Sequence, residues 1–255
     1  MTLSLQLYSL RKLPDMVPLL AQLPGLGITQ VEGFAGVYRD LHRWRTALET
    51  AGVGMPSGHI MLADIERDFA ATLTLARTLG MTRIYVPFLA PDARPSDAAG
   101  YARLSHRLNT LARRYGDAGL SFGWHNHEFE FQPLADGSMP MDILLGEAPD
   151  LSWEADLAWI VRGGQAPLAY ITRYADRINA LHVKDIAPAG AHQHEDGWAN
   201  LGAGVMDWAA LLGACRVRCS DLLYVLEHDN PSDPLGYLRA SAAAFKTLWQ
   251  ELPHA

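Results

Sequence analysis

Seven residues whose side chains can transfer protons or bind cations stand at or just after the ends of short apolar runs. They comprise one amide, three carboxylates and three imidazoles: Gln6, Glu32, His59, His125, Asp156, His182 and Glu227. A parallel strand buried on both faces is expected to be almost wholly apolar, so polar residues that recur at strand ends require an explanation. Imidazole and carboxylate groups are the usual general acids, bases and ligands of divalent cations. We therefore predict that these residues meet at one site.

Further polar residues lie two positions from members of this set. Side chains alternate along a strand, so residues two apart share a face. The pairs are His125 with His127, Glu154 with Asp156, His182 with Lys184, and Glu227 with Asp229. We expect the second member of each pair to face the same site. The chain has only three lysines, so the placement of Lys184 is the less expected by chance.

Four of these residues form a predicted metal site: His125, Asp156, His182 and Glu227. Two imidazoles and two carboxylates suit Mn²⁺, Zn²⁺, Co²⁺ or Fe²⁺, with open positions for substrate oxygens, better than Ca²⁺ or an all-thiolate site. We predict that the substitution Asp156→Ala abolishes metal retention.

The elements that must position these residues alternate between short β-branched or aromatic runs and longer helical patterns. Apolar spacing predicts helices over 65–79, before Gly80, and 101–118, before Gly119. This alternation indicates an α/β protein, a single (β/α)8 TIM barrel over residues 1–255, whose active site lies at the carboxyl ends of the strands. Residues 188–204 are predicted to form a functional loop over the barrel mouth. The predicted strands are 3–7, 28–32, 53–57, 83–87, 120–124, 151–155, 178–182 and 222–226.

The composition restricts the classes of partner. The chain has 255 residues, of which 49% are hydrophobic and 19% charged, enough for a sizeable core. Its formal charge of −7 disfavours a nucleic-acid partner. No 18-residue apolar run or basic leader occurs, so we predict a soluble cytoplasmic protein without a membrane partner. Cys215 and Cys219 have no disulfide or CxxC spacing and are predicted to be ordinary buried thiols. Nothing in the sequence indicates the oligomeric state.

Motifs distributed along nearly the whole chain resemble one family. In order they are QLYSLR, VEGF, SGH, GWHNHEFEF, WEADLAWIVRGG, LHVKD, LGAGVMDW and VLEHD. Together they resemble the sugar phosphate isomerase/epimerase group of xylose-isomerase-like TIM barrels. The HNH segment is similar to the subgroup that includes inosose-dehydratase-like and 3-keto-glycoside-processing proteins.

The resemblance implies a ligand set. Ketose 3-epimerases of the group hold a divalent metal with Glu, Asp, His and Glu after strands five to eight, and the last three match Asp156, His182 and Glu227. The sequence departs from the pattern twice: His125 replaces the first Glu, and Trp159 replaces a second His. Because the two glutamates are the acid/base pair of the epimerases, elimination competes with isomerisation as the expected reaction.

The implied chemistry is removal of a proton next to a carbonyl, with a metal stabilising the enediolate. Glu227 or Glu154 is the candidate base, and His125 or His127 the residue that returns the proton. Lys184 is expected to hold a substrate oxygen. The residues expected to bind sugar hydroxyls are Gln6, Glu32, His59 and His127.

Several residues have structural alternatives. His59 and His127 are equally compatible with ordinary loop histidines, and Glu154 with an internal salt bridge to Arg162 or Arg177. Asp185 is expected to fix a neighbouring loop or to orient His182. The loop histidines and the tryptophans are expected to be solvated and packed, respectively, rather than part of the site: His192 and His194; Trp124, Trp153, Trp159 and Trp198.

Three other functions remain open at this stage. A metal-dependent dehydratase or lyase acting on an inosose or a 3-keto-glycoside shares the proton-removal step. A non-catalytic sugar-binding barrel is compatible with the missing glutamate. An endonuclease acting at abasic sites shares the superfamily barrel, but it needs three clustered metals and a basic groove, and the charge of −7 opposes it.

Overall fold

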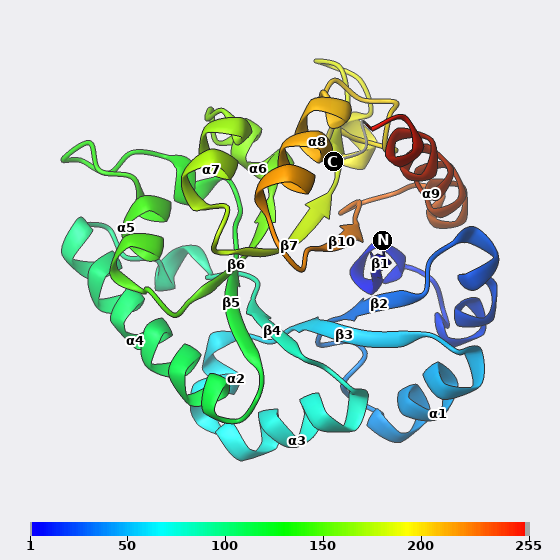
Figure 1. Cartoon of the computed structure of the whole chain (residues 1–255), viewed down its shortest axis with the longest axis horizontal. Helices are drawn as coiled ribbons and strands as arrows, with labels where there is room; N and C mark the ends of the chain where they lie inside the picture. Colours follow the sequence, from blue (N-terminus) through cyan, green and yellow to red (C-terminus); the bar gives the residue numbers. More distant parts are fainter. Residues whose placement is uncertain (1, 253–255) are drawn as a thin grey trace.

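Eight parallel strands close into a barrel in the computed structural model of the chain, which describes residues 2–252. Around the barrel the strand order is β1-β10-β7-β6-β5-β4-β3-β2, so neighbours in sequence are neighbours in space. Figure 1 shows the strands at the centre and the helices outside them. The barrel strands are β1 (Leu3–Gln6), β2 (Gln30–Gly33), β3 (Gly54–His59), β4 (Arg83–Val86), β5 (Ser121–His125), β6 (Ser152–Asp156), β7 (Ile178–Val183) and β10 (Leu223–Leu226).

The predicted (β/α)8 barrel is confirmed. Each of the eight predicted strands overlaps an observed one, and no boundary differs by more than two residues. The β-branched and aromatic runs therefore located the strands, because such residues fit a sheet whose two faces are both covered.

The helices follow the strands in the expected order. They are α1 (Leu41–Ala51), α2 (Leu62–Arg67), α3 (Phe69–Leu79), α4 (Ala98–Asp117), α5 (Pro140–Glu147), α6 (Leu157–Arg162), α7 (Pro167–Tyr174), α8 (Trp208–Arg218) and α9 (Pro234–Glu251).

The helix predicted over 65–79 is wrong as a single element. It is divided at Asp68, which has extended backbone angles and caps α3 by accepting a hydrogen bond from the Ala71 N–H at 2.9 Å. An aspartate offers the start of a new helix a better partner than a helix interior, so the capping contact outweighs the apolar periodicity.

The first crossover also departs from the ideal pattern. Residues 7–29, all of which the structure describes, contain three short 3₁₀ segments (Leu7–Leu10, Val17–Gln22 and Pro24–Leu26) and no α-helix. Pro18 and Pro24 stand in the first turns of the last two, where the missing N–H is tolerated. Frequent prolines prevent one continuous α-helix here.

The barrel interior is filled beneath its carboxyl end. Tyr85, Ala180, Leu223 and Val225 form a small apolar cluster separate from the main core, which packs between strands and helices. A Cβ at Gly123 would come within 2.8 Å of the Tyr85 ring and 2.6 Å of the Ser152 carbonyl oxygen. The absence of a side chain at Gly123 therefore leaves space for the Tyr85 ring, which fills the barrel interior. Gly123 stands two residues before His125 in β5.

The loop predicted over residues 188–204 contains one strand of a short hairpin. Asp185–Ile186 (β8) pairs with Trp198–Ala199 (β9) in a short antiparallel hairpin. The Asp185 carboxylate accepts backbone hydrogen bonds from Ile186, Gly202, Gly204 and Met206. This confirms that Asp185 fixes the neighbouring loop. Within residues 2–252, no helix is long and apolar enough to cross a membrane.

Candidate active site

The barrel gathers the strand-end residues predicted from the sequence around one opening. A cavity of about 480 Å³ is bordered there by His59, His125, His127, Glu227 and Asp229. Behind this surface, Gln6, Glu32, Glu154, Asp156 and His182 are all buried. The side chains form two hydrogen-bonded groups that share the mouth of the barrel.

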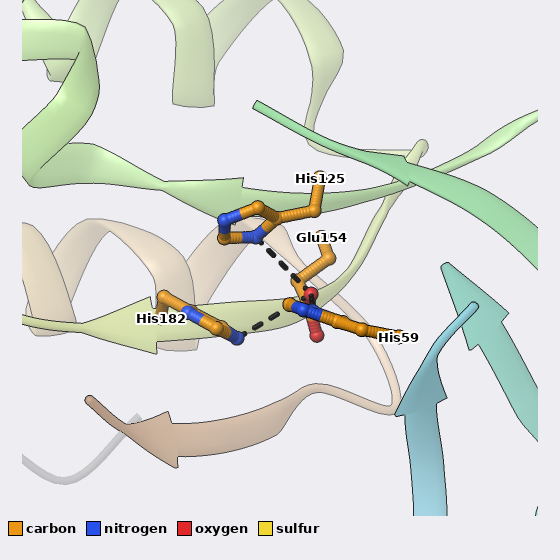
Figure 2. Close-up of side chains that lie close together, drawn as sticks. All are labelled: His59, His125, Glu154 and His182. Atoms are coloured by element: carbon orange, nitrogen blue, oxygen red, sulfur yellow. Dashed lines mark hydrogen bonds and ion pairs between the residues drawn. The ribbon is translucent and has the colours of Figure 1, made fainter. Parts of the chain in front are cut away.

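The first, which we call the inner group, consists of His59, His125, Glu154 and His182. Glu154 Oε2 is its centre, at 2.5 Å from His59 Nε2, 3.1 Å from His125 Nδ1 and 3.3 Å from His182 Nε2. Figure 2 shows the three imidazoles converging on this carboxylate. The side chains come from β3, β5, β6 and β7, so barrel closure brings them together.

Glu32 and Gln6 extend the inner group toward β1 and β2. Glu32 Oε1 accepts a hydrogen bond from Gln6 Nε2 at 2.8 Å and lies 2.8 Å from His182 Nε2. Burial and the nearby Glu154 carboxylate raise the pKa of Glu32 to about 6. Glu154 of the inner group and the adjacent Glu32 are thus two buried carboxylates that face three imidazoles, with no lysine or arginine paired to them among residues 2–252.

Two buried carboxylate oxygens of this region, Glu32 Oε2 and Glu154 Oε1, have no hydrogen-bond partner within residues 2–252. An unpartnered buried polar atom is costly, and such atoms often mark a site for an ion or a ligand. Three imidazoles and a carboxylate are also the donor types that Zn²⁺ and related cations prefer. The residues present therefore fit a divalent metal.

The second, which we call the lysine group, consists of Lys184, Asp156, Glu227 and Asp229. Lys184 Nζ lies 3.2 Å from Asp156 Oδ2, 2.9 Å from Glu227 Oε2 and 2.8 Å from Asp229 Oδ1. Burial by itself lowers the pKa of Lys184, but Asp156, Asp229 and Glu227 outweigh burial and raise it above its ordinary value. An ammonium ion has three N–H donors, and here each faces a carboxylate. Binding of a substrate oxygen by Lys184 would require one of these contacts to be exchanged.

His182 connects the two groups through its two ring nitrogens. Nδ1 lies 2.8 Å from Glu227 Oε2 in the lysine group, and Nε2 lies close to Glu32 and Glu154 on the inner side. Burial opposes the charged form of Glu227, but Lys184 and His182 outweigh it and hold the pKa of Glu227 well below its usual range. Glu227 is therefore a carboxylate at neutral pH.

Asp156 is fixed by contacts that the sequence did not predict. Its Oδ1 accepts the Trp159 N–H at 2.9 Å and caps α6. The Asn126 side chain accepts the Asp156 N–H and donates to the Asp156 carbonyl oxygen, each at 3.0 Å, and it also accepts the Trp153 indole N–H. Asn126 stands between the two histidines of the HNH motif, which was the available signal for its role.

Glu130 is a second buried residue that sequence reasoning missed. Its carboxyl group accepts hydrogen bonds from the Trp124 indole at 2.9 Å and from the His127 backbone N–H at 2.8 Å. Burial raises the pKa of Glu130 to about 8. Burial also lowers the pKa of His127 well below its ordinary value, so the ring that borders the cavity is neutral. The signal for Glu130 in the sequence was its position in the EFEF segment that directly follows the HNH motif.

The salt bridge of Glu154 to Arg162 or Arg177 is wrong, because its partners are the three histidines. Arg177 donates instead to the Leu151 carbonyl oxygen, and Arg162 lies 3.2 Å from the centre of the Trp198 ring.

The two loop histidines are solvated and three of the four tryptophans are packed, as predicted. His192 and His194 are exposed, and neither borders the cavity. Trp124, Trp153 and Trp198 are fully buried and pack in the protein. Trp159 is half-buried, with its ring 5.1 Å from that of His127. Of the two cysteines, Cys215 is buried and Cys219 half-buried, and both are free thiols.

Apolar and aromatic side chains also border the cavity, which the sequence did not predict. It is bordered by Tyr8, Phe34, Met61 and Phe88. The Tyr8 and Phe34 rings pack edge to face at a centroid distance of 5.5 Å. Both residues belong to quoted motifs, QLYSLR and VEGF, but only the fold shows that they border the same opening as the histidines.

Comparison with known proteins gives matches of the same type. Residues 25–248 match the model of the xylose isomerase-like TIM barrel family. An inosose dehydratase of Klebsiella pneumoniae is 35% identical over 101 residues, a match that spans 38% of this chain and 33% of that protein.

Solved structures agree in fold. A sugar phosphate isomerase/epimerase from Parabacteroides distasonis is 22% identical with a TM-score of 0.77, and the match covers 95% of this chain and 92% of that one. The IolI protein, solved with a bound zinc atom, is 13% identical with a TM-score of 0.80 over 100% of both chains. With the family match covering most of the barrel, this chain belongs to the xylose isomerase-like TIM barrel family.

Proposed function

We propose that this protein is a divalent-metal-dependent sugar isomerase or epimerase that removes a proton next to a carbonyl group. The observation that carries the proposal is the ionised Glu227 carboxylate bordering the same cavity as His59 and His125 of the metal-compatible inner group. A small carbohydrate is the proposed ligand. A nucleic acid is not, because the net charge of −7 opposes a phosphate backbone.

The sequence-based ligand set for the metal is His125, Asp156, His182 and Glu227, and it includes the two histidines shared with the inner group. A bound divalent cation would act as a Lewis acid, stabilising negative charge on substrate oxygens as the enediolate develops.

Glu227 is the proposed base. Its contacts with Lys184 and His182 both use Oε2, which leaves Oε1 to accept the substrate proton. Lys184 keeps this carboxylate charged and fixed in position, because the ammonium ion is held on its other sides by Asp156 and Asp229. His127, also at the cavity, is the proposed group that returns the proton: its neutral ring takes up a proton from solvent on one nitrogen as it delivers the proton of the other.

A second candidate is a dehydratase or lyase, in which proton removal is followed by loss of a neighbouring hydroxyl or glycosidic oxygen. The specific support is the match to the Klebsiella inosose dehydratase. Both reactions begin with the same proton transfer, so the same residues are proposed for each.

The test is solvent exchange in deuterium oxide. The protein, stripped with a chelator and reloaded with Mn²⁺, Zn²⁺, Co²⁺ or Fe²⁺, is incubated with a panel of ketoses, an inosose and 3-keto-glycosides, and deuterium next to the carbonyl is measured by NMR. We expect metal-dependent exchange that falls by about 100-fold or more in Glu227→Gln, the range for loss of a general base. Exchange with formation of the epimer supports the isomerase, and exchange with an unsaturated product supports the lyase.

A matched control uses Glu251→Gln, at the exposed end of α9, which keeps wild-type exchange. Absence of exchange with every sugar and metal would contradict both reactions and favour a non-catalytic sugar-binding barrel. Cleavage of abasic DNA by the loaded protein would contradict the proposed substrate class.

A further inference from the structure

Two overlapping sets of side chains at the mouth are able to hold one cation. One is the inner group, His59, His125, Glu154 and His182, and the other is the sequence-based set, which replaces His59 and Glu154 by Asp156 and Glu227. His125 and His182 belong to both, so the metal position depends on which carboxylates receive it.

The carboxylates of the sequence-based set are already neutralised. Lys184 lies 3.2 Å from Asp156 Oδ2 and 2.9 Å from Glu227 Oε2, and its side chain is 1% exposed. A dication bound to the same oxygens would lie within a few ångströms of a buried ammonium ion, where water screens their repulsion poorly. Asp156 Oδ1 is also occupied by the Trp159 N–H at the start of α6.

The inner group has the opposite character. Glu154 Oε1 and Glu32 Oε2 are buried and have no hydrogen-bond partner within residues 2–252. Among residues 2–252, the positive charge available to these carboxylates comes from imidazoles alone, which lose their protons readily when a metal binds. A cation placed here meets donors and no fixed positive charge in contact with them.

The separations also suit a tetrahedral ion. Ligand atoms around zinc, with bonds of about 2.0–2.1 Å, lie roughly 3.3 Å apart. Glu154 Oε2 is 3.1 Å from His125 Nδ1 and 3.3 Å from His182 Nε2, so only its 2.5 Å contact with His59 Nε2 must lengthen. His59 and His125 border the cavity, which gives a substrate oxygen access to the ion.

We propose that the metal binds to the inner group, with His59, His125, Glu154 and His182 as its ligands, and that Lys184 occupies the position of a cation between Asp156 and Glu227. This inference rests on the proposed metal dependence and assigns separate roles to the carboxylates. Glu154 binds the metal at the base of the cavity, and Glu227 remains free of it and acts as the base.

The deciding experiment is a crystal structure of the wild-type protein reloaded with Zn²⁺, with anomalous data collected on both sides of the zinc absorption edge. We expect a peak within bonding distance of Glu154 and His59. A peak bonded to Asp156 and Glu227 would overturn the inference while preserving the proposed metal dependence. Absence of a peak, together with no bound metal by mass spectrometry for any of the four ions, would overturn both.

A matched pair of variants gives an independent measurement in solution. Zinc affinity is measured by competition with a chromophoric chelator for Glu154→Gln and Asp156→Asn, with circular dichroism confirming the fold of each. We expect Glu154→Gln to weaken binding by about 100-fold or more, and Asp156→Asn by no more than about tenfold, the lower limit for loss of an outer partner. The reverse order of effects would overturn the inference. If Glu154→Gln does not fold, His59→Gln, which removes a neutral ligand, takes its place with the same expectation.

Discussion

The inner group and the lysine group bury carboxylates in two different ways within one barrel mouth. Glu32 and Glu154 face imidazoles, whose charge depends on pH and which can exchange a proton for a metal. Asp156 and Glu227 face the Lys184 ammonium, whose charge is retained at every physiological pH. Two acidic residues of one motif, such as Glu154 and Asp156, can therefore have different roles, because a different cationic group contacts each of them.

The largest effect is expected from removal of the fixed cation. Lys184→Met leaves the buried carboxylates of Asp156 and Glu227, and the partly exposed Asp229, without their partner, and breaking a buried ion pair typically costs about 3–5 kcal/mol. Urea unfolding followed by circular dichroism measures this loss. The control, Lys246→Met on the exposed side of α9, should change stability by less than about 0.5 kcal/mol. Equal stability of the two variants would show that Lys184 is not needed to bury these carboxylates.

The next largest effect is the stabilisation of the folded protein by zinc bound to the inner group. Zinc at about 100 times its dissociation constant should stabilise the wild type by about 2.7 kcal/mol, because it binds the folded state selectively. His59→Gln should lose most of this gain, since it removes a proposed ligand, whereas Asp229→Asn should retain it. Thermal unfolding with and without zinc gives the measurement. Full stabilisation of the His59→Gln protein would place the cation elsewhere.

Glu130 provides a third case, a buried acid neutralised by its own proton. Its pKa is raised to about 8, whereas an unfolded glutamate titrates near 4.5. The folded state therefore keeps a proton that the unfolded state has lost, and stability should fall as pH rises from about 4.5 to about 8, by at least about 1.4 kcal/mol, the value of one pKa unit. Comparison of urea midpoints across this range for the wild type and Glu130→Gln isolates the pH dependence of stability that is due to Glu130. An unchanged pH slope in the variant would contradict it.

The smallest effect concerns the outermost member of the lysine group. Asp229 has a side chain that is 22% exposed, and Lys184 keeps two other carboxylates when it is removed. Asp229→Asn should therefore cost about 0.5–1 kcal/mol, in the range of partly solvated ion pairs. The reference is Asp92→Asn in an exposed 3₁₀ turn (Pro91–Ala93), measured by the same urea titration. A loss as large as that of Lys184→Met would mean that the three carboxylates do not share the charge.

The sequence by itself determined the barrel and predicted most of the polar residues that the barrel brings to its mouth. Strands buried on both faces must be apolar, so the polar residues that end them were recognisable without coordinates, and Gln6, Glu32, His59 and Glu227 all lie at the predicted mouth. Helix boundaries were predicted less well, because a single capping contact at Asp68 outweighs the periodicity of a whole segment.

Only the tertiary structure decided which side chain contacts which. Glu154 contacts His59, which is 95 residues away, and Glu32 contacts His182 at a separation of 150 residues, because the barrel closes with a particular register between its strands. No local pattern specifies such partners. For the same reason the sequence placed Lys184 near the site but could not show that its three donors are taken by carboxylates. That depends on side chains from β6 and from the segments after β7 and β10 meeting in three dimensions.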